Sequence, residues 1–204
     1  MTLPWIIGGA AVGVLAGPPV RLGVLARYGV APPVLTVEAA AGVALAAVAA
    51  RAPSPWPLAA LAWLMLCAVP LAFIDIALRR LPDPLTVAAF AGTFGFLAVA
   101  ALAGGHPGQL LRAALAAAAA SGFYLLLFLI RPSGMGLGDV KLAASTGAAL
   151  GWLGWTALVA GTFLTFVLAA VYGLALLLLR RADRTSQLPL GPFIVAATLA
   201  AILI

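Results

Sequence analysis

The sequence predicts an all-α fold, a polytopic helical bundle that lies in a membrane. Three observations predict it: 65% of the 204 residues are hydrophobic, only 8% are charged, and the mean hydropathy is +1.21. Such a chain has too little polar surface to cover a water-soluble globule. Because one crossing needs about 20 apolar residues, the length allows roughly eight crossings in a single membrane-embedded domain, residues 1–204.

Apolar stretches between charged or proline-rich segments define the expected spans. They are 3–17, 33–50, 57–77, 84–104, 112–130, 141–155, 157–179 and 187–204. The run from Val140 to Leu179 is too long for one crossing, and we divide it at "GWLGW", residues 151–155. The first span lacks a basic segment ahead of it, so we expect it to be retained rather than removed as a signal peptide.

The basic residues are distributed unevenly over the loops, and this orients the chain. The odd loops, counted from the N-terminus, hold Arg21, Arg27, Arg79, Arg80, Arg131, Lys141, Arg180, Arg181 and Arg184, whereas the even loops hold only Arg51 and Arg112. By the positive-inside rule the odd loops face the cytoplasm, which predicts a multi-pass protein of the cytoplasmic membrane. Anionic lipid of the bilayer is then the expected partner of the arginines. No nucleic-acid partner is expected, because no basic domain lies outside the bilayer.

The chain has only five acidic residues and one cysteine, so their positions are informative. Asp183 in "RRADR" is expected to be a solvated loop charge. Glu38, near the start of the second span, either snorkels to an interface or lines the bundle interior. Cys67 lies inside the third span, where it forms neither a disulfide nor a CxxC metal site within one chain. We expect it to be a small core residue, and we expect no metal or cofactor.

Asp75 lies in "AFIDIALRRLPDPLT", near the cytoplasmic end of the third span. An ionised carboxylate in hydrocarbon costs about 2.5–3.5 kcal/mol on insertion scales, so it indicates a functional site or an ion pair. Arg79, four residues later on the same helical face, is the candidate ion-pair partner. Asp83, between two prolines, is expected to be a turn residue or the cap of the fourth span.

Asp139 follows three glycines in "SGMGLGDVKL", residues 133–142. Gly134, Gly136 and Gly138 leave the approach to the sixth span without side chains, so another backbone can come close and the loop can adopt positive φ. Asp139 can serve as the N-cap of that span. So many glycines exceed what a cap requires, and they suit a site through which an extended peptide passes.

The topology places Asp75 and Asp139 at the same cytoplasmic border, where they can meet. Two carboxylates that approach closely hold one proton between them near neutral pH. The charged carboxylate can activate a water, while the protonated one binds a peptide carbonyl and then assists the leaving amine. This chemistry is aspartyl proteolysis.

The segments "FIDIALRRLPDPLT" and "GMGLGDVKL" resemble the two signature segments of the type IV prepilin peptidases, membrane aspartyl proteases of the Gly-x-Gly-Asp class. The resemblance implies that Asp75 and Asp139 are catalytic. It also implies that the substrate is a pilin or pseudopilin precursor of a type IV pilus or secretion system, cleaved after its leader at the cytoplasmic face. The predicted substrate-binding residues are Gly134, Gly136, Gly138, Asp83 and Lys141. Longer members carry paired CxxC motifs and also N-methylate the product, so one cysteine predicts a peptidase-only short form.

Two other functions are consistent with parts of the pattern. In a proton- or ion-coupled transporter the same aspartates would relay protons and the glycines would form a broken-helix site. In a structural membrane subunit the aspartates would only cap helices and pair with arginine. Neither accounts for two motifs at one membrane face, so the peptidase is favoured.

Overall fold

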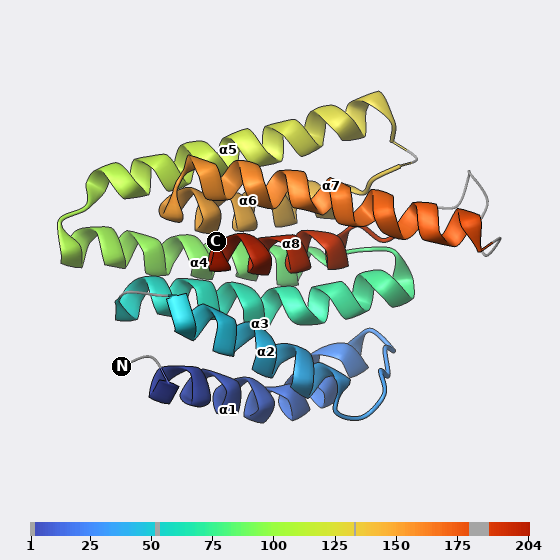
Figure 1. Ribbon diagram of the computed structural model, residues 1–204, viewed down its shortest axis with the longest axis horizontal. Coiled ribbons are helices and arrows are strands. Elements are labelled where there is room, and N and C mark those ends of the chain that lie inside the picture. Colours follow the sequence, from blue (N-terminus) through green and yellow to red (C-terminus); the bar gives the residue numbers. More distant parts are fainter. Residues whose placement is uncertain (1–2, 52–53, 133, 180–187) are drawn as a thin grey trace.

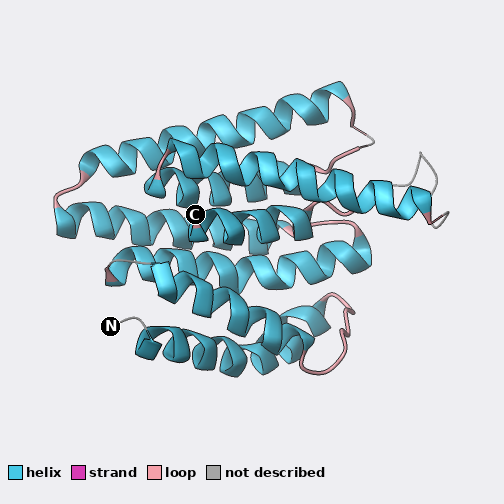
Figure 2. Ribbon diagram, in the orientation of Figure 1, coloured by secondary structure: helices cyan, strands magenta, loops and turns pink. Residues whose placement is uncertain are grey.

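The computed structural model describes residues 3–51, 54–132, 134–179 and 188–204, and these parts of the chain form a helical bundle without strands (Figures 1 and 2). This confirms the predicted all-α class. The helices are α1 (Leu3–Pro19), the π-helix η1 (Val20–Leu25), α2 (Thr36–Arg51), α3 (Pro55–Leu78), α4 (Asp83–Gly104), α5 (Pro107–Ile130), α6 (Leu137–Leu153), α7 (Trp155–Leu178) and α8 (Gly191–Leu203).

Five segments of the described chain are long and apolar enough to cross a membrane: Leu3–Leu25, Pro55–Leu78, Asp83–Gly104, Pro107–Ile130 and Trp155–Leu178. The helices α2, α6 and α8 are shorter, with 16, 17 and 13 residues. The predicted division at "GWLGW" is confirmed. Gly154 separates α6 from α7. Its φ is +151°, a backbone conformation that residues with a side chain rarely adopt.

Several helix boundaries differ from the expected spans: the first helical segment continues through η1 to Leu25, α2 begins at Thr36 and α5 begins at Pro107. Two further differences bear on the site. The last span was expected from residue 187, but α8 begins only at Gly191 and residues 188–190 are not helical. Prolines explain this start, since Pro189 has no N–H to donate and Pro192 occupies a favourable position in the first helical turn. The helix α6 begins earlier than expected, at Leu137, so Asp139 lies in its first turn instead of ahead of it.

Helix α6 is largely buried and packs closely against α5 through small residues. A Cβ atom on Gly147 would lie 2.8 Å from the Cβ of Ala120, and one on Gly151 would lie 2.2 Å from the Cβ of Ala116. Small residues allow this close approach between helices in a membrane. Arg112 donates to the carbonyls of Gly151 and Trp152 at 2.7 and 2.6 Å, so it satisfies the C-terminal end of α6. These contacts fix the helix that carries Asp139.

Glu38 lines the interior of the bundle, one of the two positions expected for it. Its side chain is buried and accepts a hydrogen bond from Arg21 Nε at 3.0 Å. Gly17 of α1 makes room, because a Cβ there would lie 2.5 Å from Cγ of Glu38. Cys67 is buried, as expected of a small core residue. Asp183, Arg180, Arg181 and Arg184 lie outside the described residues.

The connections of the bundle separate into two ends. In Figure 1 the α1–α2, α3–α4 and α5–α6 connections lie at the right, whereas the N-terminus and the α4–α5 connection lie at the left. The first set comprises the first, third and fifth loops of the sequence, and the α4–α5 connection is the fourth. The arrangement therefore brings the loops after Asp75 and before Asp139 to the same end.

Candidate active site

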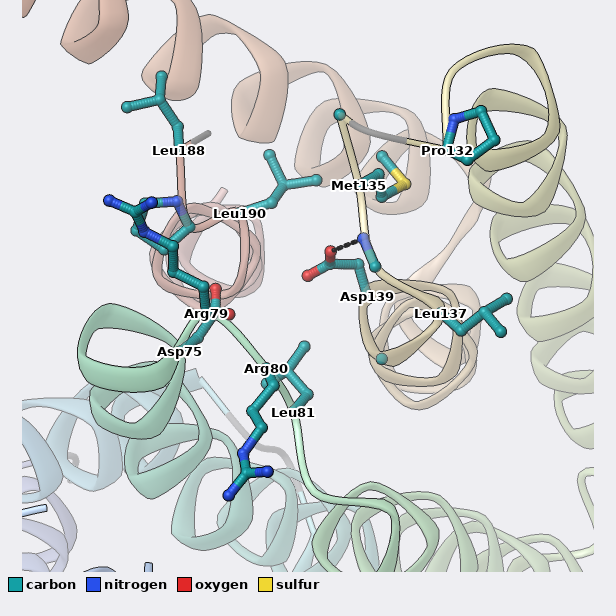
Figure 3. Close-up of a pocket in the computed structure, with 14 residues that line it drawn as sticks. Asp75, Arg79, Arg80, Leu81, Pro132, Met135, Leu137, Asp139, Leu188 and Leu190 are labelled. Carbon is teal, nitrogen blue, oxygen red and sulfur yellow. Dashed lines mark hydrogen bonds between the residues drawn. The ribbon is translucent and has the colours of Figure 1, made fainter. Parts of the chain in front are cut away.

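A pocket of about 250 Å³ lies where α3, α6 and the segment before α8 meet (Figure 3). Both aspartates of the two sequence motifs line it. The remaining lining residues are Arg79, Arg80, Leu81, Pro132, Gly134, Met135, Gly136, Leu137, Gly138, Leu188, Pro189 and Leu190. The structure thus brings together two carboxylates that are 64 positions apart, and it does so at one end of the bundle.

Asp75 lies in the last turn of α3, on the buried face that Leu71 and Ile74 share with it. Its side chain is only 5% exposed. The Oδ2 atom accepts a hydrogen bond from the backbone N–H of Gly191 at 2.8 Å. Among the residues that the structure describes, no ion pair involves Asp75, so the expected alternative of a pair with Arg79 is not observed. Arg79 instead ends the helix through its backbone, with N–H donated to the Asp75 carbonyl at 2.8 Å.

Asp139 is the third residue of α6 and is 6% exposed. It is not the N-cap, which is Gly136, but its Oδ2 accepts the Gly136 N–H at 3.0 Å. The expected N-cap role of Asp139 is therefore wrong, and its carboxylate supports the cap residue from the third position of the helix through one oxygen. The other, Oδ1, is buried and has no hydrogen-bond partner within the described part of the chain. Such an atom is costly unless a ligand or water satisfies it, and this one belongs to a residue that lines the pocket.

Gly138 fixes the distance between the two motif segments. A Cβ at this position would lie 2.6 Å from the Cβ of Leu81 and 3.3 Å from its carbonyl oxygen. The prediction that another backbone comes close to the glycines is confirmed here. The expected positive φ is not found, because Gly134, Gly136 and Gly138 are absent from the glycines with positive φ. The loop needs these glycines for space rather than for unusual dihedral angles.

Asp83 and Lys141 bind each other at the edge of the site. Lys141 Nζ lies 2.6 Å from Asp83 Oδ1, and both side chains are exposed. Asp83 is the first residue of α4, and Pro82 is the N-cap, so the expected capping role is wrong. The pair links the start of α4 to the start of α6. Neither residue lines the pocket that holds the two aspartates, and their predicted contact with substrate stays a prediction.

The segment Leu188–Leu190 and Gly191 were missed by the sequence reasoning. Leu188 and Leu190 face the pocket opposite Met135 and Asp139 (Figure 3). Gly191 is buried against Asp75, and a Cβ there would lie 2.9 Å from Oδ2 and 3.2 Å from Cβ of that aspartate. The available signal was "LPLGP", two prolines around a glycine in an expected span. Within the described ranges no group of three His, Cys, Asp or Glu side chains could hold a metal ion.

Comparison with known proteins identifies relatives that contain the same region. Residues 58–178 match the model of the "Type IV leader peptidase family". The chain is 33% identical over 144 residues to a "Prepilin leader peptidase/N-methyltransferase" of Aeromonas salmonicida, covering 67% of this chain and 45% of that protein. It is 30% identical over 174 residues to the protein of the same name from Stutzerimonas stutzeri, covering 82% and 57%. No solved structure matches the chain.

The chain spans about half the length of the curated relatives it matches. The family match includes both motif segments, since Asp75 and Asp139 lie within residues 58–178. Residues 188–190, which complete the pocket, and Gly191, which bonds to Asp75, lie beyond it.

Proposed function

The chain belongs to the type IV leader peptidase family, and on this premise we propose that it is an aspartyl endopeptidase of the cytoplasmic membrane. Its substrates are pilin-like precursors, and it removes their leader peptides at the cytoplasmic face. The observation that carries this proposal is the meeting of Asp75 and Asp139 in one pocket at one end of the bundle. The transporter alternative receives no support, because the matched relatives are named as leader peptidases.

The two aspartates are held in the same way, and this arrangement suits a catalytic pair. Each has one oxygen held by a backbone N–H, from Gly191 for Asp75 and from Gly136 for Asp139. These bonds orient the carboxylates and leave the second oxygens for substrate and water. Since two buried carboxylates in one pocket repel when both are charged, the state with one shared proton is favoured.

With one proton on the pair, one carboxylate can act as the base and the other as the acid in hydrolysis. The charged carboxylate takes a proton from a water, whose oxygen attacks the carbonyl carbon of the scissile peptide bond. The protonated carboxylate donates a hydrogen bond to the carbonyl oxygen. When the tetrahedral intermediate collapses, the C–N bond breaks and a proton passes to the leaving amine. The products are the leader with a new carboxylate and the mature protein with a new N-terminal amine.

The basic residues support the proposed orientation. Arg79 and Arg80 lie in the α3–α4 connection, and Arg131 follows α5 at the same end of the bundle (Figure 1). Positive charge favours the cytoplasmic side. Precursors reach this side before they are assembled or exported, so their leaders would meet the pocket here.

The test is incubation of the purified protein with candidate pilin-like precursors, followed by mass spectrometry of the products. We expect one cleavage, and the new N-terminus of the mature fragment should lie just before an apolar segment. Intact precursor in every case, with a protein that remains folded and monodisperse, would contradict the proposal.

A further inference from the structure

An apolar groove lies between α2, α3 and α8, apart from the pocket that holds the two aspartates. Its volume is about 440 Å³, and all twelve residues that line it are apolar, five of them alanine. Ala44, Val69 and Val195 are buried and form its floor, whereas Val43 and Ile76 at its edge are 65% and 58% exposed. The groove is therefore open on one side, and in a bilayer that side faces lipid.

The groove follows the axes of two of its helices. On α3 its residues run from Val69 to Ile76 and on α8 from Pro192 to Leu199, in both cases with the spacing i, i+3, i+4 and i+7. This spacing places them on one face of each helix over about 10 Å, or about two turns. The alanines allow the backbone of another helix to come close, as small residues do between helices in a membrane. The groove therefore has the length and the surface to bind about two turns of an apolar helix.

The groove begins beside Asp75. Ile76, which lines the groove, follows Asp75 directly in the chain. Pro192 lines it from α8 and follows Gly191, whose N–H is donated to Oδ2 of Asp75 at 2.8 Å. Helix α3 ends and α8 begins at the end of the bundle that holds the pocket (Figure 1). The groove therefore runs from the pocket of the two aspartates toward the opposite end of the bundle.

We propose that this groove binds the apolar segment of the precursor, as a helix, over the turns that follow the scissile bond. The inference rests on the proposed function, since it concerns the same substrate. A precursor whose scissile bond lies between the two aspartates must continue from that point into the bilayer. An apolar surface that starts at the pocket and follows the helices inward can hold this segment while the bond is cleaved. Helices bind to apolar grooves through residues with the spacing i, i+3, i+4 and i+7.

Lipid acyl chains and a second copy of this chain are the competing occupants of an apolar groove in a membrane. The position of the groove favours the precursor, because neither competitor needs a surface that begins at Asp75. The alanines favour a helix over an acyl chain, since small residues serve the close approach of two helix backbones. The apolar segment of the precursor meets both conditions.

The first measurement uses a synthetic peptide of the apolar segment alone, without the leader or the scissile bond. It should inhibit cleavage of a precursor competitively, because it occupies the groove that the precursor needs. Ala196→Leu places a larger side chain in the groove, since Ala196 is exposed there. We expect this variant to raise the inhibition constant about ten-fold, the effect of one misfit in an apolar site. Ala119→Leu is the matched control, because Ala119 of α5 is exposed outside the groove, and its inhibition constant should equal that of the wild type.

The second measurement is disulfide cross-linking, which does not depend on cleavage. The parent protein carries Cys67→Ala together with Asp75→Asn and Asp139→Asn, so that a bound precursor stays intact. A single Val43→Cys is added at the edge of the groove, and single cysteines are placed along the first three turns of the precursor's apolar segment. We expect cross-links at precursor positions that share one helical face. Ala119→Cys in the same parent should give none.

Folding does not confuse these tests, because Ala196 and Ala119 are exposed helical positions and alanine and leucine have similar helix propensities. Both leucine variants should melt like the wild type. Absence of inhibition, or an inhibition constant that changes equally in the two variants, would overturn the inference.

The cross-links separate the competing occupants. Cross-linking that is as strong from Ala119→Cys as from Val43→Cys would overturn the inference and leave the groove to lipid. Cross-linking only between two copies of the enzyme would overturn it in favour of a second copy. Cross-linking of the precursor to Val43→Cys, with no precursor cleaved by the wild type, would support the groove and overturn the proposed function.

Discussion

Gly191 donates its backbone N–H to Oδ2 of Asp75 at 2.8 Å, across 116 positions of the sequence. This bond makes the start of α8 a third part of the site, beside the two motif segments. The glycine is needed because any larger residue would press on the carboxylate. Residues 188–190, which precede it, form a wall of the same pocket. The orientation of one aspartate therefore depends on the C-terminal helix.

Gly191→Ala should lower kcat by about ten-fold to a hundred-fold, because small misplacements of a catalytic group have effects of this size. The added Cβ would lie 2.9 Å from Oδ2 and 3.3 Å from Cγ of Asp75, so the carboxylate must move. Single-turnover cleavage of a precursor measures the effect. Gly122→Ala is the control, since its Cβ would meet nothing within 4 Å. A wild-type rate in Gly191→Ala would show that Asp75 does not need this position.

Gly138→Ala should lower both stability and activity. Its Cβ would lie 2.6 Å from the Cβ of Leu81, so the α3–α4 connection and the start of α6 would be pushed apart. Overpacking of this kind costs about 1–3 kcal/mol. Thermal unfolding in detergent and the cleavage rate should both change, again relative to Gly122→Ala. An unchanged melting temperature would mean that the two segments can separate freely.

The sequence predicted those parts of the site in which the residue type itself has few structural explanations. Acids are costly in an apolar chain, so each of the five was informative. The two motif segments and their common membrane border then selected Asp75 and Asp139. The close approach at Gly138 was also predicted, because three glycines ahead of a helix indicate a need for space. The break near Gly154 was predicted because the apolar run around it is longer than one membrane-crossing helix.

The missed parts depend on tertiary contacts that no local pattern encodes. Asp83 was expected to be a turn residue or the cap of the fourth span, but its side chain binds a lysine 58 positions away. Asp139 was expected either to cap α6 or to catalyse, but the N-cap is Gly136. One oxygen of Asp139 accepts the N–H of that glycine, and the other has no hydrogen-bond partner among the described residues. Gly191 was absorbed into an apolar span, since only the fold shows that its N–H meets Asp75.

Asp83→Asn should retain most of the stability and most of the activity. The Asp83–Lys141 pair is exposed, and such pairs contribute about 0–1 kcal/mol, less at high salt. Lys141→Met should have a similar small effect, and the double variant should be no worse than either single one, because each change breaks the same pair. Cleavage rates and melting temperatures test this. A large rise in KM in both single variants would instead support the predicted contact of these residues with substrate.

Cysteines introduced at Arg80 and Arg131 should be protected from an impermeant thiol reagent in intact cells, and one at His106 should react. The first two positions lie at the end of the bundle with the odd loops, and His106 lies in the α4–α5 connection at the other end (Figure 1). Cys67 should be replaced by alanine in the parent protein, although it is buried. The reverse labelling pattern would place the pocket on the outer side and contradict the proposed orientation.

Asp75→Asn, Asp139→Asn and the double variant should all have the same low residual cleavage rate, at least about a thousand-fold below that of the wild type. Residues that act as one unit do not have additive effects, since the loss of either removes the shared proton and the pair that holds it. The structure also explains why asparagine is the informative substitution. Its amide oxygen can still accept the N–H of Gly191 or Gly136, so the local backbone is supported while the carboxylate is lost.

Alanine at the same positions provides the folding control for this pair. Asp75→Ala and Asp139→Ala leave the N–H groups of Gly191 and Gly136 without their acceptors, and an unsatisfied buried donor costs about 1–3 kcal/mol. The alanine variants should therefore melt at lower temperature than the asparagine variants while being equally inactive. If an asparagine variant melts like the wild type and still cleaves precursor at a near-normal rate, the carboxylate pair is not the catalyst. The aspartates would then serve only to hold α6 and α8 in place.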